Sequence, residues 1–569
     1  MQPVDYTTLV AICHSLNSAH LPSRLEQVYQ IDRTTITLCL RSVSKKSWLT
    51  IAWHPQGARI CIGNPPPRQK DTFTLSEQLR HLINGYALIG VEIVSAWERV
   101  MDFQFAQRPS ESPLYHLYVE IMGKYSNVIL TNAEKQIITV AKQVTAQKST
   151  LRTVETSQTY QLPPPLTGNT PKLSESWAQW QETVNLIPGR IDKQLIKSYR
   201  GVSPTLARQL LQQAEIDPLT PNHELTISQW ENLYTQWQNW LTTIENKDFF
   251  PHVTPWGYTV IKSPHAKEKI NLHTLINNYY QIQLNQEKFQ QLQQQLLQKI
   301  KNILTKLLIK AEKYQNKLTE SDNAEIHRQQ ADLLMANLHQ YKIGSSSIIL
   351  NDFVTNKPLT INLAPHKNII QNAQDLYKKY QKLSRAKNIV LPLLTEVQTE
   401  INYFKQIENN ILQLENDQLE SLDILLEIKG ELIQQKYIED AQYRQNNINE
   451  ESQPRHFVSP SGYEILVGKN NRQNDLLTSR IATDYDLWFH AQEIPGSHVL
   501  LRLNAGDIPD QKDLQFTANL AGYYSRGRES EQIPVIYTKP KYVYKPKGAK
   551  PGMVIYTRET VIWAKPSDV

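Results

Sequence analysis

Cysteine is scarce in this sequence of 569 residues. All three cysteines lie near the N-terminus, and no two of them have CxxC spacing; they are Cys13, Cys39 and Cys61. A disulfide framework needs paired cysteines and an oxidising compartment, so an odd and unpaired set argues against one. We therefore expect free, buried thiols in a reducing compartment.

Long hydrophobic runs and targeting signals are also missing. No uninterrupted apolar segment reaches the roughly 18 residues that a membrane-spanning helix needs. The first residues, MQPVDYTTLVAICHSL, carry no basic region ahead of their short apolar run, which is a poor match to a signal peptide. The sequence predicts a cytoplasmic protein with no membrane partner.

The motifs of common catalytic centres are absent. There is no GxxxxGKS or GxxxxGKT, no GxGxxG after a strand, no GxSxG and no HExxH spacing. His490 and His498 are candidate metal ligands, but no cysteine accompanies them, and Asp484 and Asp486 are not at diagnostic spacing. We favour structural histidines here, and we expect no metal, no cofactor and no enzyme activity of the chain's own.

What the sequence does have is enough length for three or four domains. An apolar content of 40% and a charged content of 20% suit a globular protein, and the net charge of +6 is too modest to establish nucleic-acid binding by itself. About the first 170 residues predict a mixed α/β domain, with helices over residues 7–16 and 75–84. Runs of β-branched and aromatic residues predict strands over residues 31–40, 48–53, 91–97, 100–105, 115–121, 126–131 and 136–140.

A Trp-rich segment over residues 175–255 is predicted to be helical. Within it, Gly201 suits the end of one helix, and Ser203 followed by Pro204 suits the N-cap and first position of the next. Such a hairpin can direct backbone N–H groups at a phosphate. An ordinary turn between two helices gives the same pattern, so both interpretations stay open.

Two long proline-free stretches, residues 265–357 and 393–453, carry apolar residues at steps of three and four. These positions are Phe289, Leu292, Leu296, Ile300, Ile303 and Leu307 in the first stretch and Val397, Ile401, Phe404, Ile407, Ile411 and Leu414 in the second. The spacing predicts an antiparallel coiled-coil arm, with a small hairpin at its tip over residues 347–350 and 359–363. Gln-rich low complexity is the alternative, but the sustained apolar seam argues against disorder.

The region after residue 455 predicts a small α/β module. A turn over residues 459–462 leads into a strand over 463–467, and strands over 487–490 and 498–503 flank a turn at 495–497. Between them, Asn471 is the predicted N-cap of a helix, which would direct Lys469 and free N–H groups toward an anion.

The tail over residues 535–565 is basic and aromatic. Its cations are Lys539, Lys541, Lys545, Lys547, Lys550, Arg558 and Lys565, against the single acid Glu559, and its interleaved aromatic residues are Tyr537, Tyr542, Tyr544, Tyr556 and Trp563. Cations attract phosphates, and aromatic faces stack on unpaired bases, so RNA is the predicted partner. A solvated basic surface is the alternative interpretation.

Acidic and basic residues also occur together in the N-terminal domain. Glu98 and Arg99 stand at the predicted end of a strand, and Glu120 precedes Gly123 and Lys124. These groups can gather around an anionic or nucleotide ligand. On spacing alone, a surface salt bridge explains them equally well.

Several short blocks are specific in combination. They are VGKNNRQND from Val467, DLWFH from Asp486, PGSHV from Pro495, VIYT from Val535, KPKG from Lys545, KPG from Lys550, EIMGK from Glu120 with Ser126 and Asn127, and NAQ from Asn372 with Tyr377, Tyr380 and Lys382. Together they resemble the NFACT family, that is, the RqcH/NEMF group also described as fibronectin-binding protein A-like. The resemblance covers essentially the whole chain.

The resemblance implies a multidomain α+β fold with four parts in the family's order. These are a glycosylase-N-like α/β N-domain (NFACT-N) over residues 1–172, a helical helix-hairpin-helix domain over 173–262, a long antiparallel coiled coil with a small tip over 263–447, and an α/β C-terminal NFACT-R module over 448–569.

The resemblance also implies a role in ribosome-associated quality control. Such proteins bind the large ribosomal subunit that holds a stalled peptidyl-tRNA–nascent chain complex, recruit charged tRNA (alanyl-tRNA in bacteria), and direct template-free alanine tailing while the ribosome makes the peptide bond. The implied tRNA-binding residues are Asp5, Glu98, Arg99, Glu120, Ile121, Met122, Gly123 and Lys124. The implied RNA-binding residues are Lys469, Asn470, Asn471, Trp488, His490, His498, Lys545 and Lys547.

The chain departs from the family at one important position. The family's tRNA-selecting Asp–Arg pair is Glu98–Arg99 here, so the carboxylate lies one methylene further out and its hydrogen bonds to a tRNA edge are expected to be reset. Three alternatives follow: a nucleic-acid-binding protein that has lost tailing, a surface fibronectin-binding adhesin, and a DNA-repair glycosylase. The poor signal peptide argues against the adhesin, and the missing Pro-Glu start and four-cysteine zinc finger argue against the glycosylase.

Overall fold

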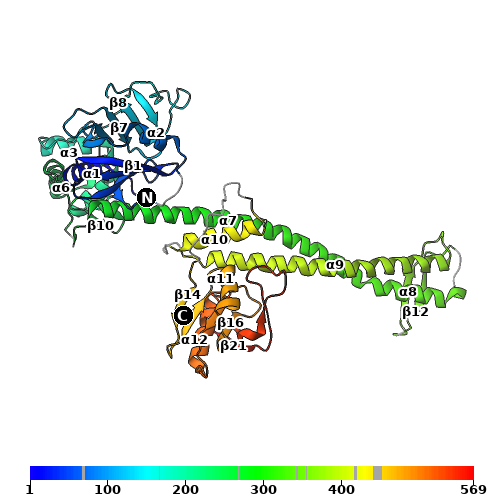
Figure 1. The fold of residues 1–569 in the computed structure, drawn as a ribbon. Helices are drawn as coiled ribbons and strands as arrows, with labels where there is room; N and C mark the ends of the chain where they lie inside the picture. Colours follow the sequence, from blue (N-terminus) through cyan, green and yellow to red (C-terminus); the bar gives the residue numbers. More distant parts are fainter. Residues whose placement is uncertain are drawn as a thin grey trace. The chain divides into compact units, whose positions relative to one another are not determined.

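The structure is a computed structural model that describes residues 1–66, 71–165, 167–264, 266, 268–340, 344–353, 355–415, 420–439 and 452–569. The chain divides into two compact units, residues 1–284 and 285–569, and each is described by itself (Figure 1). The four-part division predicted from the sequence is finer than these two units. Both units mix helices with antiparallel sheets, in agreement with the predicted α+β class.

A nine-stranded antiparallel sheet forms the first unit's framework, in the order β4-β3-β2-β1-β5-β6-β7-β8-β9. Its strands are β1 (Ser23–Asp32), β2 (Thr35–Arg41), β3 (Lys46–Ala52), β4 (Arg59–Gly63), β5 (Ala87–Ile93), β6 (Val100–Ala106), β7 (Tyr115–Glu120), β8 (Asn127–Asn132) and β9 (Ile137–Val140). The two predicted helices are confirmed as α1 (Tyr6–His20), which packs on β5, and α2 (Thr74–Ile83), which packs on β1.

Two predicted strands of this sheet need correction. The strand predicted over residues 31–40 is wrong as a single element, because a turn at Arg33 and Thr34 separates β1 from its partner β2. The strand predicted over residues 91–97 ends at Ile93, and the backbone then turns through Trp97, whose φ of 68° lies in the left-handed region. That turn sets the direction of the two residues that follow it.

Helices complete the first unit, as the Trp-rich composition predicts. They are α3 (Trp177–Asn185), α4 (Ile191–Ser198), α5 (Pro204–Gln213), α6 (Ile227–Asn246) and the start of α7 (Leu272–Asp322), with a ribbon of β10 (His252–Thr254) and β11 (Gly257–Thr259) before α7. Trp180, Trp237 and Trp240 are fully buried among them. The Trp240 indole N–H donates to Thr7 Oγ1 at 2.9 Å, which ties α6 to α1 and gives helices and sheet a common core.

The predicted hairpin between two helices is present as α4 and α5. Ser203 is the N-cap of α5, since its Oγ accepts the Leu206 N–H at 3.0 Å, and Pro204 takes the first helical position, as predicted. The preceding helix ends at Ser198 and not at Gly201. Gly201 has φ +77°, and a Cβ there would lie 2.6 Å from the Trp97 ring, so only glycine fits against Trp97.

Two long helices dominate the second unit: the rest of α7, and α9 (Ile369–Leu412). They run antiparallel, because Gln293 Nε2 donates to the Ile411 carbonyl at 3.2 Å while Lys387 Nζ lies 2.7 Å from Asp322 Oδ1. All twelve predicted seam positions lie in one apolar cluster between these helices, either buried or packed against it. The predicted coiled-coil seam is therefore confirmed.

The boundaries predicted for the second of these helices are wrong. Helix α9 runs through Pro392 rather than starting after it, and it ends at Leu412. Pro392 is exposed, so the carbonyl that loses its N–H partner there can face water. A separate helix, α10 (Ser421–Gln434), follows. The remainder of the predicted stretch includes residues 416–419 and 440–451, which lie outside the described residues.

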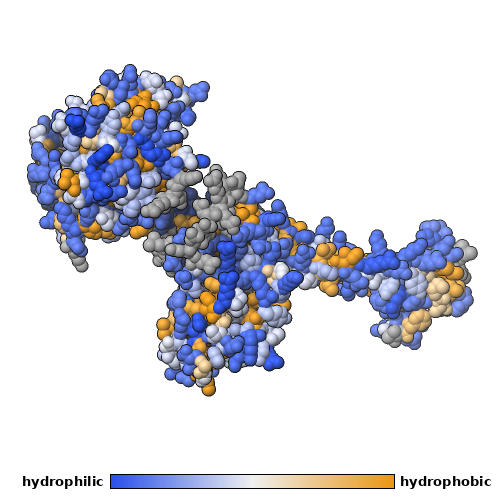
Figure 2. Space-filling model, in the orientation of Figure 1, coloured by the Kyte–Doolittle hydropathy of each residue, from blue (hydrophilic) through white to orange (hydrophobic). Residues whose placement is uncertain are grey.

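The predicted hairpin at the tip is confirmed as β12 (Ser347–Asn351) paired with β13 (Pro358–Asn362). It shares an apolar cluster with α8 (Ala324–Ala336) and the start of α9. Figure 1 shows α8 and β12 at the end of the paired helices away from α10. The visible surface of these helices is largely hydrophilic, with hydrophobic residues in separate patches (Figure 2).

The C-terminal module of the second unit has a six-stranded antiparallel sheet in the order β14-β15-β17-β16-β18-β21. Its elements are β14 (Arg455–Val458), β15 (Glu464–Val467), α11 (Asn471–Leu476), β16 (Leu487–Ala491), β17 (Val499–Leu501), α12 (Gln511–Tyr523), β18 (Ile533–Thr538), β19 (Val543–Tyr544), β20 (Ile555–Tyr556) and β21 (Thr560–Ala564). Helix α12 packs on one face of the sheet, and the ribbon of β19 and β20 packs on the other.

Candidate nucleic-acid interface

The turn between β5 and β6 positions the Glu98–Arg99 pair. The buried Trp97 packs against Tyr6 of α1, with ring centroids 4.6 Å apart, and against Trp240 of α6, at 5.5 Å. These contacts hold a left-handed backbone conformation that is unusual for a bulky residue. Arg99 is thereby fixed next to the first residues of α1 and the hairpin between α4 and α5.

A cavity of about 170 Å³ opens beside Arg99. Three segments far apart in the sequence line it: Pro3 to Tyr6, Trp97 with Arg99, and Gly201 to Pro204. The cavity lies at the N-terminal ends of α1 and α5, where backbone N–H groups favour a negatively charged ligand. The predicted residues Asp5 and Arg99 are brought together here, whereas Glu98 does not line the cavity.

Asp5 connects the two helix starts. Its Oδ1 accepts the Thr8 N–H at 2.9 Å and the Thr8 hydroxyl at 2.7 Å, so it is the N-cap of α1. Its Oδ2 accepts the Ser203 hydroxyl at 2.8 Å, and Ser203 caps α5. Because both carboxylate oxygens are engaged, Asp5 positions the walls of the cavity and also supplies negative charge near Arg99.

Arg99 is the side chain in this cavity with unused hydrogen-bonding capacity. Burial lowers the pKa of its guanidinium, and the charges of Asp5 and Glu98 oppose that shift. Within the described part of the chain, no hydrogen bond to the guanidinium is found. A guanidinium carries five N–H donors in a planar fork suited to two acceptors at once, so Arg99 can grip a phosphate or a base edge.

Glu98 is 9% exposed, and its Oε1 has no hydrogen-bond partner among the residues that the structure describes. An unpaired carboxylate oxygen in a buried position is costly. It is the only member of the Glu98–Arg99 pair that the cavity does not contain, so the two side chains do different things in this structure.

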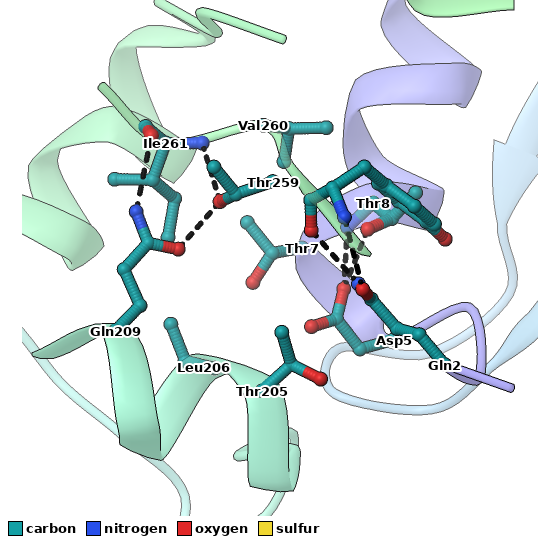
Figure 3. Close-up of a pocket in the computed structure, with 11 residues that line it drawn as sticks. Gln2, Asp5, Thr7, Thr8, Thr205, Leu206, Gln209, Thr259, Val260 and Ile261 are labelled. Carbon is teal, nitrogen blue, oxygen red and sulfur yellow. Dashed lines mark hydrogen bonds between the residues drawn. The ribbon is translucent and has the colours of Figure 1, made fainter. Parts of the chain in front are cut away.

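A second cavity, on the other side of Asp5, is too small for a ligand (Figure 3). It holds about 10 Å³, which is space for one water molecule. Figure 3 shows Asp5 and Thr8 facing α5, where Gln209 accepts the Thr259 hydroxyl and donates to the Ile261 carbonyl at 3.1 Å. These bonds join α1, α5 and the segment after β11, so this cavity is structural.

Glu120 is predicted to bind tRNA, but the structure places it in a buried ion pair. It is 1% exposed and accepts two hydrogen bonds from Arg152, at 2.6 and 3.1 Å, and one from the Tyr160 hydroxyl at 2.9 Å. Its neighbours Tyr118 and Tyr160 belong to a different apolar cluster from that beside Arg99. The structure does not bring Glu120 to the cavity.

The residues after Glu120 form a tight turn. Ile121 is buried and its N–H donates to the Arg99 carbonyl at 2.9 Å, while the Met122 N–H donates to Ser126 Oγ at 2.8 Å. Gly123 has φ +59°, and the exposed Lys124 lies over the Tyr125 ring at 4.9 Å. Of the predicted block 120–124, Lys124 is therefore the member that presents a charge to solvent.

In the C-terminal module, the predicted phosphate-binding residues contact α10 instead. Lys469 Nζ lies 2.7 Å from Glu420 Oε2, Asn470 donates to Glu427 at 2.6 Å, and Asn471 donates to Glu431 at 3.0 Å. All three side chains are buried. The predicted N-cap is wrong by one residue, because Asn470 caps the short helix α11. These side chains hold the module to α10 in this structure.

Trp488, His490 and His498 form an interior group. The Trp488 indole donates to Thr478 Oγ1 at 3.1 Å, and Thr478 Oγ1 lies 2.7 Å from His498 Nδ1. Burial lowers the pKa of His490 to about 4 and, with the neighbouring His490, that of His498 to about 3. Within the described residues, no cluster of His, Cys, Asp or Glu is arranged to hold a metal ion.

We expect acidification to loosen the sheet around His498. Its folded pKa lies below the unfolded value of about 6.5, so its contribution to stability is full above pH 6.5 and declines as the pH falls toward the folded pKa. Between pH 6.5 and 5.5 the loss should be about 1 kcal/mol. Hydrogen exchange of the β16 and β17 amides measures it, and His498→Asn should remove most of the pH dependence. An equal response in that variant would contradict the assignment.

Lys545 and Lys547 lie in the exposed loop after β19. Lys545 forms an ion pair with Asp475, whose other oxygen accepts the Gly552 N–H at 3.1 Å. Lys547 is exposed, and no ion pair to it is found in the described ranges. The sequence pattern did not connect Ser203 or Trp97 with Arg99, since these residues are brought together only by the tertiary packing.

No helix in the described part of the chain has the length and apolarity needed to cross a membrane. The cavity beside Arg99 and the exposed basic tail are thus the two candidate nucleic-acid contacts, one in each unit.

Comparison with known proteins identifies relatives along nearly the whole chain. Rqc2 homolog RqcH of Bacillus subtilis (strain 168) is 31% identical over 564 residues, covering 97% of this chain and 96% of that protein. Rqc2 homolog RqcH of Streptococcus suis (strain 05ZYH33) is 29% identical over 558 residues, covering 96% and 95%. A solved structure of the C-terminal part of the fibronectin/fibrinogen-binding protein from Streptococcus suis is 30% identical, with a TM-score of 0.38, and covers 49% of this chain and 95% of that one.

Family models cover both units. Residues 5–451 match the model of the NFACT N-terminal and middle domains, and residues 453–557 match that of the NFACT protein RNA binding domain. Together with the full-length relatives, these matches show that the chain belongs to the NFACT family.

Proposed function

We propose that this chain is a ribosome quality control factor that binds the large ribosomal subunit and tRNA. The full-length similarity to RqcH proteins and the match to an RNA-binding domain support this role. The observation that carries the tRNA assignment is the Arg99 guanidinium, which lines a cavity at two helix N-termini. The setting that follows from this proposal is the cytoplasm.

The cavity supports recognition rather than catalysis. Arg99 offers a fork of N–H donors, and the starts of α1 and α5 add a favourable potential for an anion. The cavity supplies neither a nucleophile with an adjacent base nor a metal cluster, so we infer that the chain recruits charged tRNA and that the ribosome makes the peptide bond. Alanyl-tRNA and alanine tailing are the substrate and the product that we propose.

The bound complex that we propose is a large subunit with a stalled peptidyl-tRNA and its nascent chain. The described structure supplies basic groups for such a complex in each unit: Arg99 and Lys124 in the first, Lys547 in the second. Glu98, buried beside Arg99, is in a position to adjust the guanidinium electrostatically. We infer that the identity of this carboxylate influences which tRNA is accepted.

Co-sedimentation tests the proposal. In a lysate with stalled ribosomes, the protein should migrate with free large subunits in low-salt gradients and should dissociate as the salt concentration rises, because phosphate contacts release counterions. Crosslinking followed by sequencing should then recover tRNA from the same fraction. Absence of the protein from the large-subunit fraction at low salt would refute the proposal.

A further inference from the structure

The ribbon of β19 and β20 presents an unpaired aromatic residue to solvent. Val543 pairs with Tyr556 and Tyr544 pairs with Ile555 across the ribbon. Val543 and Tyr556 face the sheet, in the cluster that contains Trp488. Alternation along a strand therefore puts Tyr544 and Ile555 on the outward face, where they are 53% and 46% exposed. Within the described ranges, the Tyr544 ring has no aromatic or cationic neighbour and its hydroxyl has no hydrogen bond.

Cations surround this outward face. Tyr542, two residues before Tyr544, lies between Lys541 Nζ, 5.3 Å from its ring centroid, and the Arg558 guanidinium, at 4.8 Å. Arg558 also donates to the Tyr542 hydroxyl at 3.0 Å, which keeps the guanidinium beside the ring. Lys547 follows Tyr544 by three residues and is exposed.

Other basic residues of the tail already have intramolecular partners. Lys545 is paired with Asp475, and Lys550 donates to Gln435 at 3.1 Å and lies 4.9 Å from the Tyr437 ring centroid. These two lysines attach the loop to α11 and to the segment after α10. The charges left for a ligand are those of Lys541, Lys547 and Arg558.

We propose that this outward face, made of Lys541, Tyr542, Tyr544, Lys547 and Arg558, binds an unpaired RNA segment. Tyr544 stacks on a base, and the three cations contact the flanking phosphates. An exposed ring offers little to a duplex, whose bases already stack on each other, so the chemistry favours unpaired nucleotides. The inference rests on the proposed function only in taking RNA as the ligand, and it assigns binding to the tail instead of Lys469, Asn470 and Asn471.

Fluorescence titration of the full chain with a 12-nucleotide unpaired RNA, about the span of one such site, separates stacking from charge. Tyr544→Ala should weaken binding about tenfold, and Tyr544→Phe should stay close to the unchanged protein because the ring is kept. The salt dependence should be unaltered by Tyr544→Ala, whereas Lys547→Ala should make the slope of log affinity against log salt shallower by about 0.7.

Tyr485 provides a matched control, since it is 56% exposed in the same module. Tyr485→Ala should bind the RNA like the unchanged protein. Equal loss in both alanine variants, or an equal loss for an RNA duplex of the same length, would overturn the inference. Co-sedimentation keeps the two proposals apart: if the unchanged protein migrates with large subunits but Tyr544→Ala binds unpaired RNA normally, only this inference fails. If the unchanged protein does not migrate with them, the proposed function fails and the titration is still readable.

Discussion

Replacing Arg152 with methionine is expected to lower the stability of the first unit by about 3–5 kcal/mol, because it leaves the Glu120 carboxylate buried without its cation. The two side chains are 11% and 2% exposed, and the guanidinium supplies two of the three hydrogen bonds that Glu120 accepts. The remaining donor, the Tyr160 hydroxyl, cannot neutralise the charge. Hydrogen exchange of the β7 and β8 amides measures the effect locally.

Two companion variants make this experiment decisive. Arg108 is 80% exposed and 4.0 Å from Glu111, so Arg108→Met should change stability by less than about 0.5 kcal/mol. The double variant Arg152→Met with Glu120→Met removes both charges and should recover most of the loss. If Arg152→Met matched Arg108→Met, Glu120 would not depend on the ion pair, and a direct role in tRNA binding would regain support.

Much of the helical architecture could be predicted because it is written in local patterns. The seam from Phe289 to Leu414 has helical spacing, and packing of α7 on α9 buries it as the spacing requires. Ser203 and Pro204 were recognised from capping chemistry alone. Boundaries were harder: Pro392 is a sound signal for a helix end, yet α9 continues through it where the residue is exposed.

The positions of the predicted site residues could not be derived in the same way. Glu120 and Arg99 are joined by a backbone hydrogen bond through Ile121, but their side chains border different apolar clusters. Asn470 and Asn471 carry the polar groups expected of a phosphate site, and the carboxylates of α10 engage them instead. Which partner a polar side chain meets is decided by tertiary packing, and nothing in the local sequence around 470 indicates α10.

For Arg99, replacement by alanine is expected to weaken tRNA binding by about 10- to 150-fold, the range for losing a charge-assisted hydrogen bond. Lysine in its place keeps a charge but loses the planar fork, so Arg99→Lys should recover only part of the affinity if the grip is bidentate. Quantitative tRNA binding to the full chain, with sequencing of the recovered tRNA, measures both affinity and choice.

The structure separates a selecting role for Arg99 from a merely structural one. Its guanidinium forms no hydrogen bond within the described ranges, so its removal should not break the Asp5–Ser203 contact or the caps of α1 and α5. Arg108→Ala is the matched control for removing an exposed arginine from the same sheet. If Arg99→Ala recovered the same tRNA with the same affinity, Arg99 would have no selecting role. If it lost tRNA while hydrogen exchange at the start of α1 also rose, the residue would be acting through the fold. Loss of tRNA with unchanged exchange there is the outcome that a direct contact predicts, because the cavity walls are held together by Asp5 and Ser203 and not by the guanidinium they surround.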